Sequence, residues 1–107
     1  MEKFCLICWD KPDAISLRQD NRDAHLAYLK ETGNVCFAGP FLAEAPASQE
    51  TPSVATGDMI GSLLVLAVAD REAAEHWAAH EPYQLAGLFQ RVEIHPWKHV
   101  FGGLPDA

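Results

Sequence analysis

The sequence contains few basic residues and no long apolar run. Its 107 residues include 8 Lys and Arg against 15 Asp and Glu, which gives a formal net charge of −7. Nucleic acids and anionic membrane surfaces bind basic patches, so we expect neither as a partner. No stretch approaches the roughly 20 apolar residues of a membrane-spanning helix. The first apolar run, FCLICW, lacks the basic flank and the cleavage site of a signal peptide.

Cysteine is scarce, and its number is odd. Three cysteines do not suggest a disulfide framework, and a reducing, cytoplasmic setting fits them better. Cys5 and Cys8 have the spacing of a redox or metal motif, but they lie in an apolar run that is typical of a strand. On a strand the two side chains point to opposite faces, so we expect core cysteines and neither a metal site nor a disulfide there.

The chain is long enough for one domain with its own core, which we place at residues 1–101, followed by a tail at 102–107. Hydrophobic patterning predicts strands at 3–9, 35–42, 61–69 and 89–97, helices at 14–30 and 71–80, and a short helical turn at 82–86. Residues 43–58, AEAPASQETPSVATGD, have no periodicity and many turn formers. We expect them to form a mobile connection that borders the site.

The order of these elements predicts an α+β fold of the ferredoxin-like type, βαββαβ, with a four-stranded antiparallel sheet and both helices on one face. We expect the first and third strands to lie parallel in the centre, and both helices to end at the same end of the sheet. These two strands are apolar on both faces, although helices cover only one. Another copy of the chain is the simplest cover, so we predict a homodimer that packs sheet against sheet.

Two ionisable residues lie on helix faces that the pattern predicts to be buried. His25 falls near the centre of the apolar arc of helix 14–30, and Glu81 lies four residues after Trp77 on the inner face of the second helix. Taken alone, His25 is more simply a core histidine, and Glu81, which precedes Pro82, is more simply the cap of a turn. Together, a carboxylate and an imidazole make a general acid or base, so we favour a site.

Further side chains are expected to contact a small-molecule ligand at this site. Asp10, Arg18 and Arg22 group near the start of the first helix, where they charge the rim of the pocket. Ser62 is followed by an apolar strand without a nucleophile-elbow pattern, so we interpret it as a pocket hydroxyl. We assign the remaining ligand contact to Tyr83.

No metal or cofactor is expected. His76 and His80 are four residues apart, like the pair in a zinc-binding helix, but no glutamate lies between them and no third ligand is visible. They project beside the stripe of Trp77, and we do not expect them to bind a metal.

Several short motifs, in this order, resemble the YCII family. They are DKPDAISLR with NRDAHLAYL, GNVCFAGP, GSLLVLAVADREAAEHWA and EPYQLAGLFQRVEIHPWKHVF, and the likeness covers essentially residues 3 to 101. The resemblance implies a dimeric α+β barrel of ferredoxin-like chains with a His–Asp active site in a cleft. The histidine corresponds to His25. The aspartate corresponds to Glu81, which keeps the charge and adds one methylene group.

The resemblance also implies a class of function. One branch of the family is a dehydrochlorinase that acts on a chlorinated hydroxyquinol, and the wider superfamily includes muconolactone isomerase and cofactor-independent monooxygenases. We therefore expect a cofactor-independent lyase or isomerase that moves protons on a small aromatic or lactone-like molecule, with His25 as general base beside Glu81. The alternative is a non-catalytic ligand-binding or accessory protein on the same scaffold, in which the pair only holds a polar group.

Overall fold

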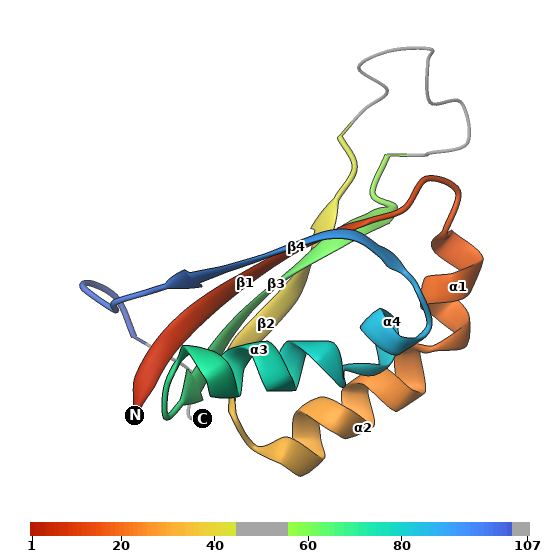
Figure 1. The fold of residues 1–107 in the computed structure, drawn as a ribbon. Helices are drawn as coiled ribbons and strands as arrows, with labels where there is room; N and C mark the ends of the chain where they lie inside the picture. Colours follow the sequence, from red (N-terminus) through yellow and green to blue (C-terminus); the bar gives the residue numbers. More distant parts are fainter. Residues whose placement is uncertain (45–55, 104–107) are drawn as a thin grey trace.

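The computed structural model describes residues 1–44 and 56–103, which form one four-stranded sheet with helices (Figure 1). The elements are β1 (Glu2–Asp10), α1 (Ile15–Asp20), α2 (Arg22–Thr32), β2 (Val35–Leu42), β3 (Met59–Val68), α3 (Arg71–Ala79), α4 (Pro82–Leu85) and β4 (Phe89–Pro96). Apart from the first helix, every predicted element is present within two residues of its predicted bounds. Among the described residues, no helix has the length and apolarity needed to span a bilayer.

The strands form an antiparallel sheet in the order β2-β3-β1-β4, which is the ferredoxin-like arrangement that the sequence predicts. The central strands β1 and β3 are antiparallel, with Leu6 opposite Leu64, so the prediction that they run parallel was wrong. The cause is the direct connection from β2 to β3. The crossover through α1 and α2 makes β1 and β2 parallel, and the chain then reverses before it enters β3.

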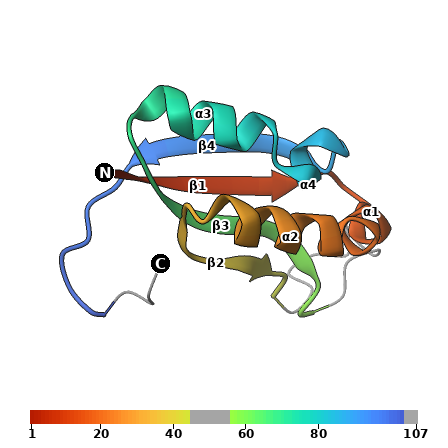
Figure 2. The same cartoon turned by 90° about the horizontal axis from the view of Figure 1, so that it is seen from below.

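The predicted helix at 14–30 is two helices that meet at Asn21. This residue has φ −109° and ψ 6°, outside the helical region, and its Nδ2 donates a hydrogen bond of 2.8 Å to the carbonyl oxygen of Leu17. α2 and α3 run in opposite directions (Figure 2), because the strands that precede them do. The expected meeting of two C-terminal helix ends was therefore wrong: the first turn of α2, which carries His25, lies beside the end of α3.

The core lies between the sheet and the helices α2, α3 and α4, which cover one side of it (Figure 1). Leu6 and Leu64 from the central strands pack with Trp77 of α3, and all three are buried. Cys8 belongs to this inner core, whereas Cys5 belongs to a separate cluster on the other face of the sheet. The predicted opposite orientation of the two cysteines is confirmed.

The outer face of the sheet is apolar and carries a cluster of Cys5, Cys36 and Val65 with partly covered neighbours. Trp9 and Phe41 also stack across this face, with ring centroids 4.7 Å apart. Gly61 lies opposite both rings in the strand pairing, and a Cβ atom there would come within 2.5 Å of the Cys8 carbonyl oxygen and 3.0 Å of the Trp9 ring. Glycine is therefore required at this position of β3.

The connection between β2 and β3 is described only at its two ends. Residues 45–55, which make up most of the predicted mobile segment 43–58, lie outside the described residues, as do residues 104–107 of the predicted tail. At the base of the connection, the backbone N–H of Ala43 donates to the carbonyl oxygen of Asp58 over 2.8 Å, and that of Gly57 donates to the carbonyl oxygen of Ala43 over 2.8 Å. These bonds extend the pairing of β2 with β3 into the connection.

Candidate functional site

Glu81 lies at the start of α4 and uses both oxygens of its carboxylate. Oε2 accepts hydrogen bonds from the backbone N–H groups of Tyr83 (3.1 Å) and Gln84 (3.3 Å), which is the pattern of a helix N-cap. Oε1 is bonded to Nδ1 of His25. Pro82 fills the first helical position, where its missing N–H has no cost. Glu81 is therefore a turn cap and a partner of the imidazole at once, which the sequence had presented as alternatives.

His25 is held at one ring nitrogen and on one ring face. The residue is only 8% exposed, and its ring stacks on Tyr83 with centroids 4.0 Å apart and planes 13° apart. When the neutral ring donates its Nδ1 proton to the Glu81 carboxylate, the lone pair lies on Nε2. Among the described residues, Nε2 has no hydrogen-bond partner. The imidazole is therefore fixed in place and still has one nitrogen free for chemistry.

Arg18 is locked in the interior by two other side chains. Its Nε and Nη2 atoms donate to the two oxygens of Asp10, each over 2.8 Å, and Nη2 also donates to Oγ of Ser62 over 3.0 Å. Burial lowers the pKa of Arg18, but the hydrogen bond and the charge of Asp10 more than offset this, so the pKa is raised above its ordinary value. The charge of this guanidinium is matched by a carboxylate with the bidentate geometry that arginine prefers.

Tyr83 connects the Arg18–Asp10 pair to the His25–Glu81 pair. Its ring stacks on the imidazole, and Cζ of Arg18 lies 4.7 Å from its centroid. Burial raises the pKa of the Tyr83 phenol above its ordinary value, although the charge of Arg18 acts in the opposite direction. The phenol is therefore protonated at neutral pH, and its ring acts as a rigid support between the two charged pairs.

The pocket beside these residues has a volume of about 160 Å³ and lies between α2 and the strands β2 and β3. A cavity of roughly 150 Å³ is enough to hold benzene, so this pocket admits one substituted ring. Its walls are largely apolar and include Leu26, Leu29, Pro40 and Met59. The pocket is therefore suited to a small planar molecule with few polar groups.

Most of the residues that the sequence predicts for the site line this pocket, namely Arg18, Arg22, His25, Ser62 and Tyr83. Glu81 and Asp10 do not line it; they stand behind His25 and Arg18, to which they are bonded. Sequence reasoning missed Pro40 and Met59, which lie near the ends of β2 and β3 nearest the connection between these strands. The only available signal was the Ala-Gly-Pro motif, which carries no chemistry of its own.

Metal-binding groups are not assembled in the part of the chain that the structure describes: no three or more His, Cys, Asp or Glu side chains are placed to hold an ion. The rings of His76 and His80 have centroids 4.2 Å apart and planes tilted by 34°, and Nδ1 of His80 donates to the backbone oxygen of His76. This bond occupies Nδ1 of His80, so the helical spacing of the pair has a structural use.

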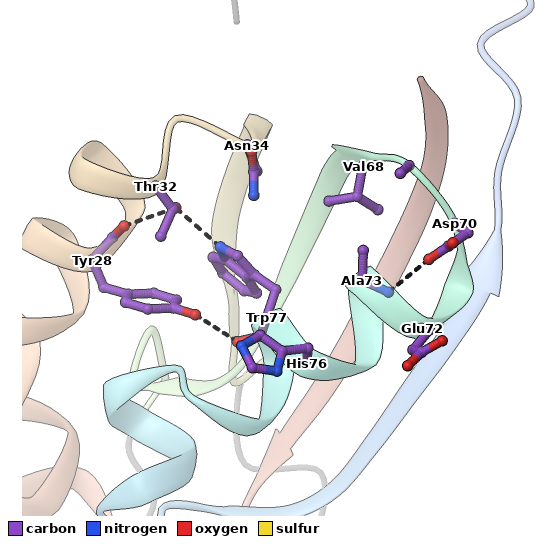
Figure 3. A pocket seen from close by; sticks show the side chains of 10 residues that line it. Tyr28, Thr32, Asn34, Val68, Asp70, Glu72, Ala73, His76 and Trp77 are labelled. Carbon is purple, nitrogen blue, oxygen red and sulfur yellow. Dashed lines mark hydrogen bonds between the residues drawn. The ribbon is translucent and has the colours of Figure 1, made fainter.

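A larger hollow, of about 590 Å³, lies at the other end of α2 and α3 (Figure 3). There the Tyr28 hydroxyl donates to the Trp77 carbonyl oxygen (2.8 Å), Trp77 Nε1 donates to Thr32 Oγ1 (3.0 Å), and Thr32 Oγ1 donates to the Tyr28 carbonyl oxygen (2.9 Å). Asp70 accepts from the backbone N–H of Ala73 (2.9 Å) and so caps α3. The remaining polar side chains of this hollow, Asn34, Glu72 and His76, make no hydrogen bond with the described residues, but they are partly or fully exposed to solvent. We therefore place the candidate site in the smaller pocket, where the imidazole is buried, despite the difference in volume.

Comparison with known proteins finds matches along almost the whole chain. The YCII-related domain matches residues 2–98 of the chain. The protein YciI of Escherichia coli O6:H1 (strain CFT073) is 34% identical over 101 residues, which cover 92% of this chain and 98% of that protein. An uncharacterized protein of Haemophilus influenzae (strain Rd) is 33% identical over 101 residues, with the same coverage.

One solved structure extends the likeness to an enzyme. It is 5-chloro-2-hydroxyhydroquinone dehydrochlorinase (TftG) from Burkholderia phenoliruptrix AC1100, in complex with 2,5-dihydroxybenzoquinone. The two chains superpose with a TM-score of 0.76 at 28% sequence identity, over 92% of this chain and 95% of that one. The similarity therefore extends over nearly the whole of both chains.

Proposed function

The chain belongs to the family of YCII-related domains, and on this premise we propose that it is a cofactor-independent lyase or isomerase that moves protons on a small ring-shaped molecule. The observation that carries the proposal is the free Nε2 atom of His25. The ring lines the pocket, and its other nitrogen is bonded to Glu81. A fixed imidazole with one free nitrogen is suited to general acid–base chemistry near neutral pH.

His25 acts as the general base in this proposal. Its Nε2 takes a proton from an O–H or an acidic C–H group of the bound ring, and Glu81 stabilises the positive charge that develops on the imidazole. In a lyase reaction, the electron pair left on the substrate forms a new π bond and expels an anion such as chloride, while the proton passes to solvent. In an isomerase reaction, the electron pair shifts a double bond and the imidazolium returns the proton to another carbon.

Tyr83 and Arg18 are positioning residues. Tyr83 keeps the imidazole plane fixed by stacking on it, and the bonds of Arg18 to Asp10 and Ser62 hold the guanidinium beside the Tyr83 ring. A ring that is held in one orientation loses no free energy to reorientation when the reaction begins. In this proposal, the buried charged pair behind the pocket supports the base and takes no part in the chemistry.

The similar structure suggests the first substrate to test. The relative is a dehydrochlorinase whose structure holds 2,5-dihydroxybenzoquinone, a molecule with one six-membered ring. A pocket of about 160 Å³ admits a molecule of this size. We therefore propose 5-chloro-2-hydroxyhydroquinone as the first compound of a panel that also contains unsaturated lactones.

The test is turnover by the wild type and by His25→Ala, followed as chloride release or as isomer formation. Loss of a general base should lower the rate by at least about 10²-fold. His76→Ala is the matched control, because this exposed histidine of α3 lies outside the pocket, and we expect it to keep the wild-type rate. Equal turnover by wild type and His25→Ala would contradict the proposal.

A non-catalytic ligand-binding protein is the second candidate, and one observation favours it. Glu81 caps α4 through Oε2, so the carboxylate has a structural role even if the imidazole never transfers a proton. This candidate predicts that the wild type binds ring-shaped molecules without turnover and without exchange of their acidic protons with deuterated solvent. Proton exchange that depends on His25 would exclude it.

We also propose that two copies of the chain pair through the outer face of the sheet. Val65 is buried there, but its apolar neighbours Ile7 and Leu63 are only partly covered, and Trp9 is 37% exposed. Pairing of two such faces should bury more than about 1,000 Å² in total. Light scattering at micromolar concentration should give the mass of a dimer for the wild type and of a monomer for Leu63→Glu. A stable wild-type monomer would contradict this proposal.

A further inference from the structure

Two guanidinium groups line the pocket, and among the described residues only one of them has a matching negative charge. Arg18 is buried and makes a bidentate pair with Asp10. Arg22 is exposed and makes no hydrogen bond or ion pair with any residue of 1–44 or 56–103. Arginine keeps its charge at any physiological pH, so Arg22 leaves one positive charge at the pocket without a partner among these residues.

The lining of the pocket contains no carboxylate, although the chain is strongly acidic overall. The chain has a net charge of −7, yet the described lining residues include two arginines and a histidine and no carboxylate. Arg22 precedes His25 by three residues on α2, and residues at this spacing lie on the same side of a helix. A guanidinium beside an apolar pocket binds planar oxyanions through paired N–H donors.

We propose that Arg22 selects the ligand: the pocket takes ring-sized molecules that carry an oxyanion, either a carboxylate or an ionised phenol, and Arg22 binds this group. The reacting proton then lies toward His25, one helical turn away. This placement of the proton rests on the proposed function. The selection of an anion rests on the charges that line the pocket, and so it can be tested without turnover.

The test uses pairs of probes that share a shape and differ in charge. Benzoate and benzamide form the carboxylate pair. At pH 9, 4-nitrophenolate and the neutral 4-nitroaniline form the phenolate pair, so the two pairs distinguish the two sources of an oxyanion. Dissociation constants are measured by NMR titration for the wild type, Arg22→Gln and Arg71→Gln. Arg71, exposed at the start of α3, is the matched control because its substitution removes the same charge outside the pocket.

The wild type should bind at least one charged probe about 10-fold more tightly than its neutral partner, the size expected for one hydrogen bond to a charged group. Arg22→Gln should bring this ratio close to one, and Arg71→Gln should leave it unchanged. Equal binding of charged and neutral probes, binding of no probe, or a ratio that survives Arg22→Gln would overturn the proposal. Because no outcome depends on turnover, a failure here is separable from a failure of His25 as a base.

Discussion

Two hollows lie beside α2, one shared with α3 and one with the strands β2 and β3, and they differ in what their polar groups bond to. In the larger one, Tyr28, Thr32 and Trp77 donate and accept among themselves (Figure 3). In the smaller one, Nε2 of His25 and the guanidinium of Arg22 have no partner among the described residues. The larger hollow also has polar side chains without a hydrogen bond among the described residues, namely Asn34, Glu72 and His76, but these are partly or fully exposed to solvent. A free nitrogen on a buried, fixed side chain such as His25, more than volume, therefore distinguishes the candidate site.

The largest effect should come from breaking the buried ion pair of Arg18 and Asp10 beside the smaller hollow. Arg18→Leu leaves the Asp10 carboxylate, whose side chain is only 6% exposed, without its donor. Removing one partner of a buried pair costs about 3–5 kcal/mol, so the free energy of unfolding in urea should fall by that amount. The control is Arg91→Leu, which removes an exposed ion pair with Glu93 and should cost less than about 1 kcal/mol. An equal fall in the free energy of unfolding of the two variants would show that the buried pair of Arg18 with Asp10 does not stabilise the fold more than an exposed pair.

A second prediction concerns Cys8, which lies in the inner core near Glu81. Burial first, and then the charges of Glu81 and Asp10, raise the pKa of this thiol to about 12. A group whose pKa is raised on folding stabilises the fold fully below its unfolded pKa, about 9, and this stability is lost as pH rises toward 12.

The stability of the wild type should therefore fall relative to Cys8→Ala by roughly 2–3 kcal/mol between pH 8 and pH 11. Comparing the two urea unfolding curves isolates the thiol, because the tyrosines, whose pKa values burial also raises, are present in both proteins. Parallel pH profiles would mean that Cys8 is less enclosed than its 2% exposure indicates.

The third prediction separates the two roles of Glu81. Glu81→Gln keeps the shape and an oxygen that can cap α4, but it replaces a charged partner of His25 with a neutral one. The difference between a charged and a neutral hydrogen bond is about 1–1.5 kcal/mol, so turnover should fall about 10-fold, less than for His25→Ala. Glu81→Asp, which restores the charge, should recover part of the rate. A full rate in Glu81→Gln would leave this residue with its capping role alone.

The smallest effect on the candidate site should come from the larger hollow. Thr32→Val keeps the shape of the side chain but removes both the acceptor of the Trp77 Nε1 hydrogen bond and the donor to the Tyr28 carbonyl oxygen. The loss of these two hydrogen bonds should lower the free energy of unfolding by about 1–2 kcal/mol. Binding of benzoate should not change. A marked loss of benzoate binding would break the distinction between the two hollows.

The fold and the pairing of His25 with Glu81 could be predicted from the sequence, because the patterns that indicate them are local. The alternation of apolar residues predicts each strand, and the position of Glu81 just before Pro82 indicates a carboxylate at a helix boundary. The expectation that His25 and Glu81 meet because both helices end at the same end of the sheet was nevertheless wrong. The relative direction of α2 and α3 depends on the reversal of the chain between β2 and β3. The sequences of the two helices do not indicate this reversal.

For the same reason, the sequence could not predict that Arg18 is paired with a carboxylate and Arg22 is not. The sequence groups both arginines at the rim of one pocket. Arg18 is neutralised by Asp10 of β1 and also bonds to Ser62 of β3. These two residues lie close to Arg18 only after the sheet has formed. Periodicity also did not predict the break at Asn21, where a side chain competes with the backbone for a carbonyl oxygen.

The most direct test of the proposed mechanism is to determine which ring nitrogen of His25 carries the proton. Nitrogen-15 NMR of the histidine side chains, recorded from pH 6 to pH 10, distinguishes a ring nitrogen that carries a proton from one that carries a lone pair. The account predicts that the neutral ring holds its proton on Nδ1, toward Glu81, and presents a bare Nε2 to the pocket, and that Glu81→Gln weakens this preference. A neutral wild-type ring with its proton on Nε2 would contradict the assignment of His25 as the base.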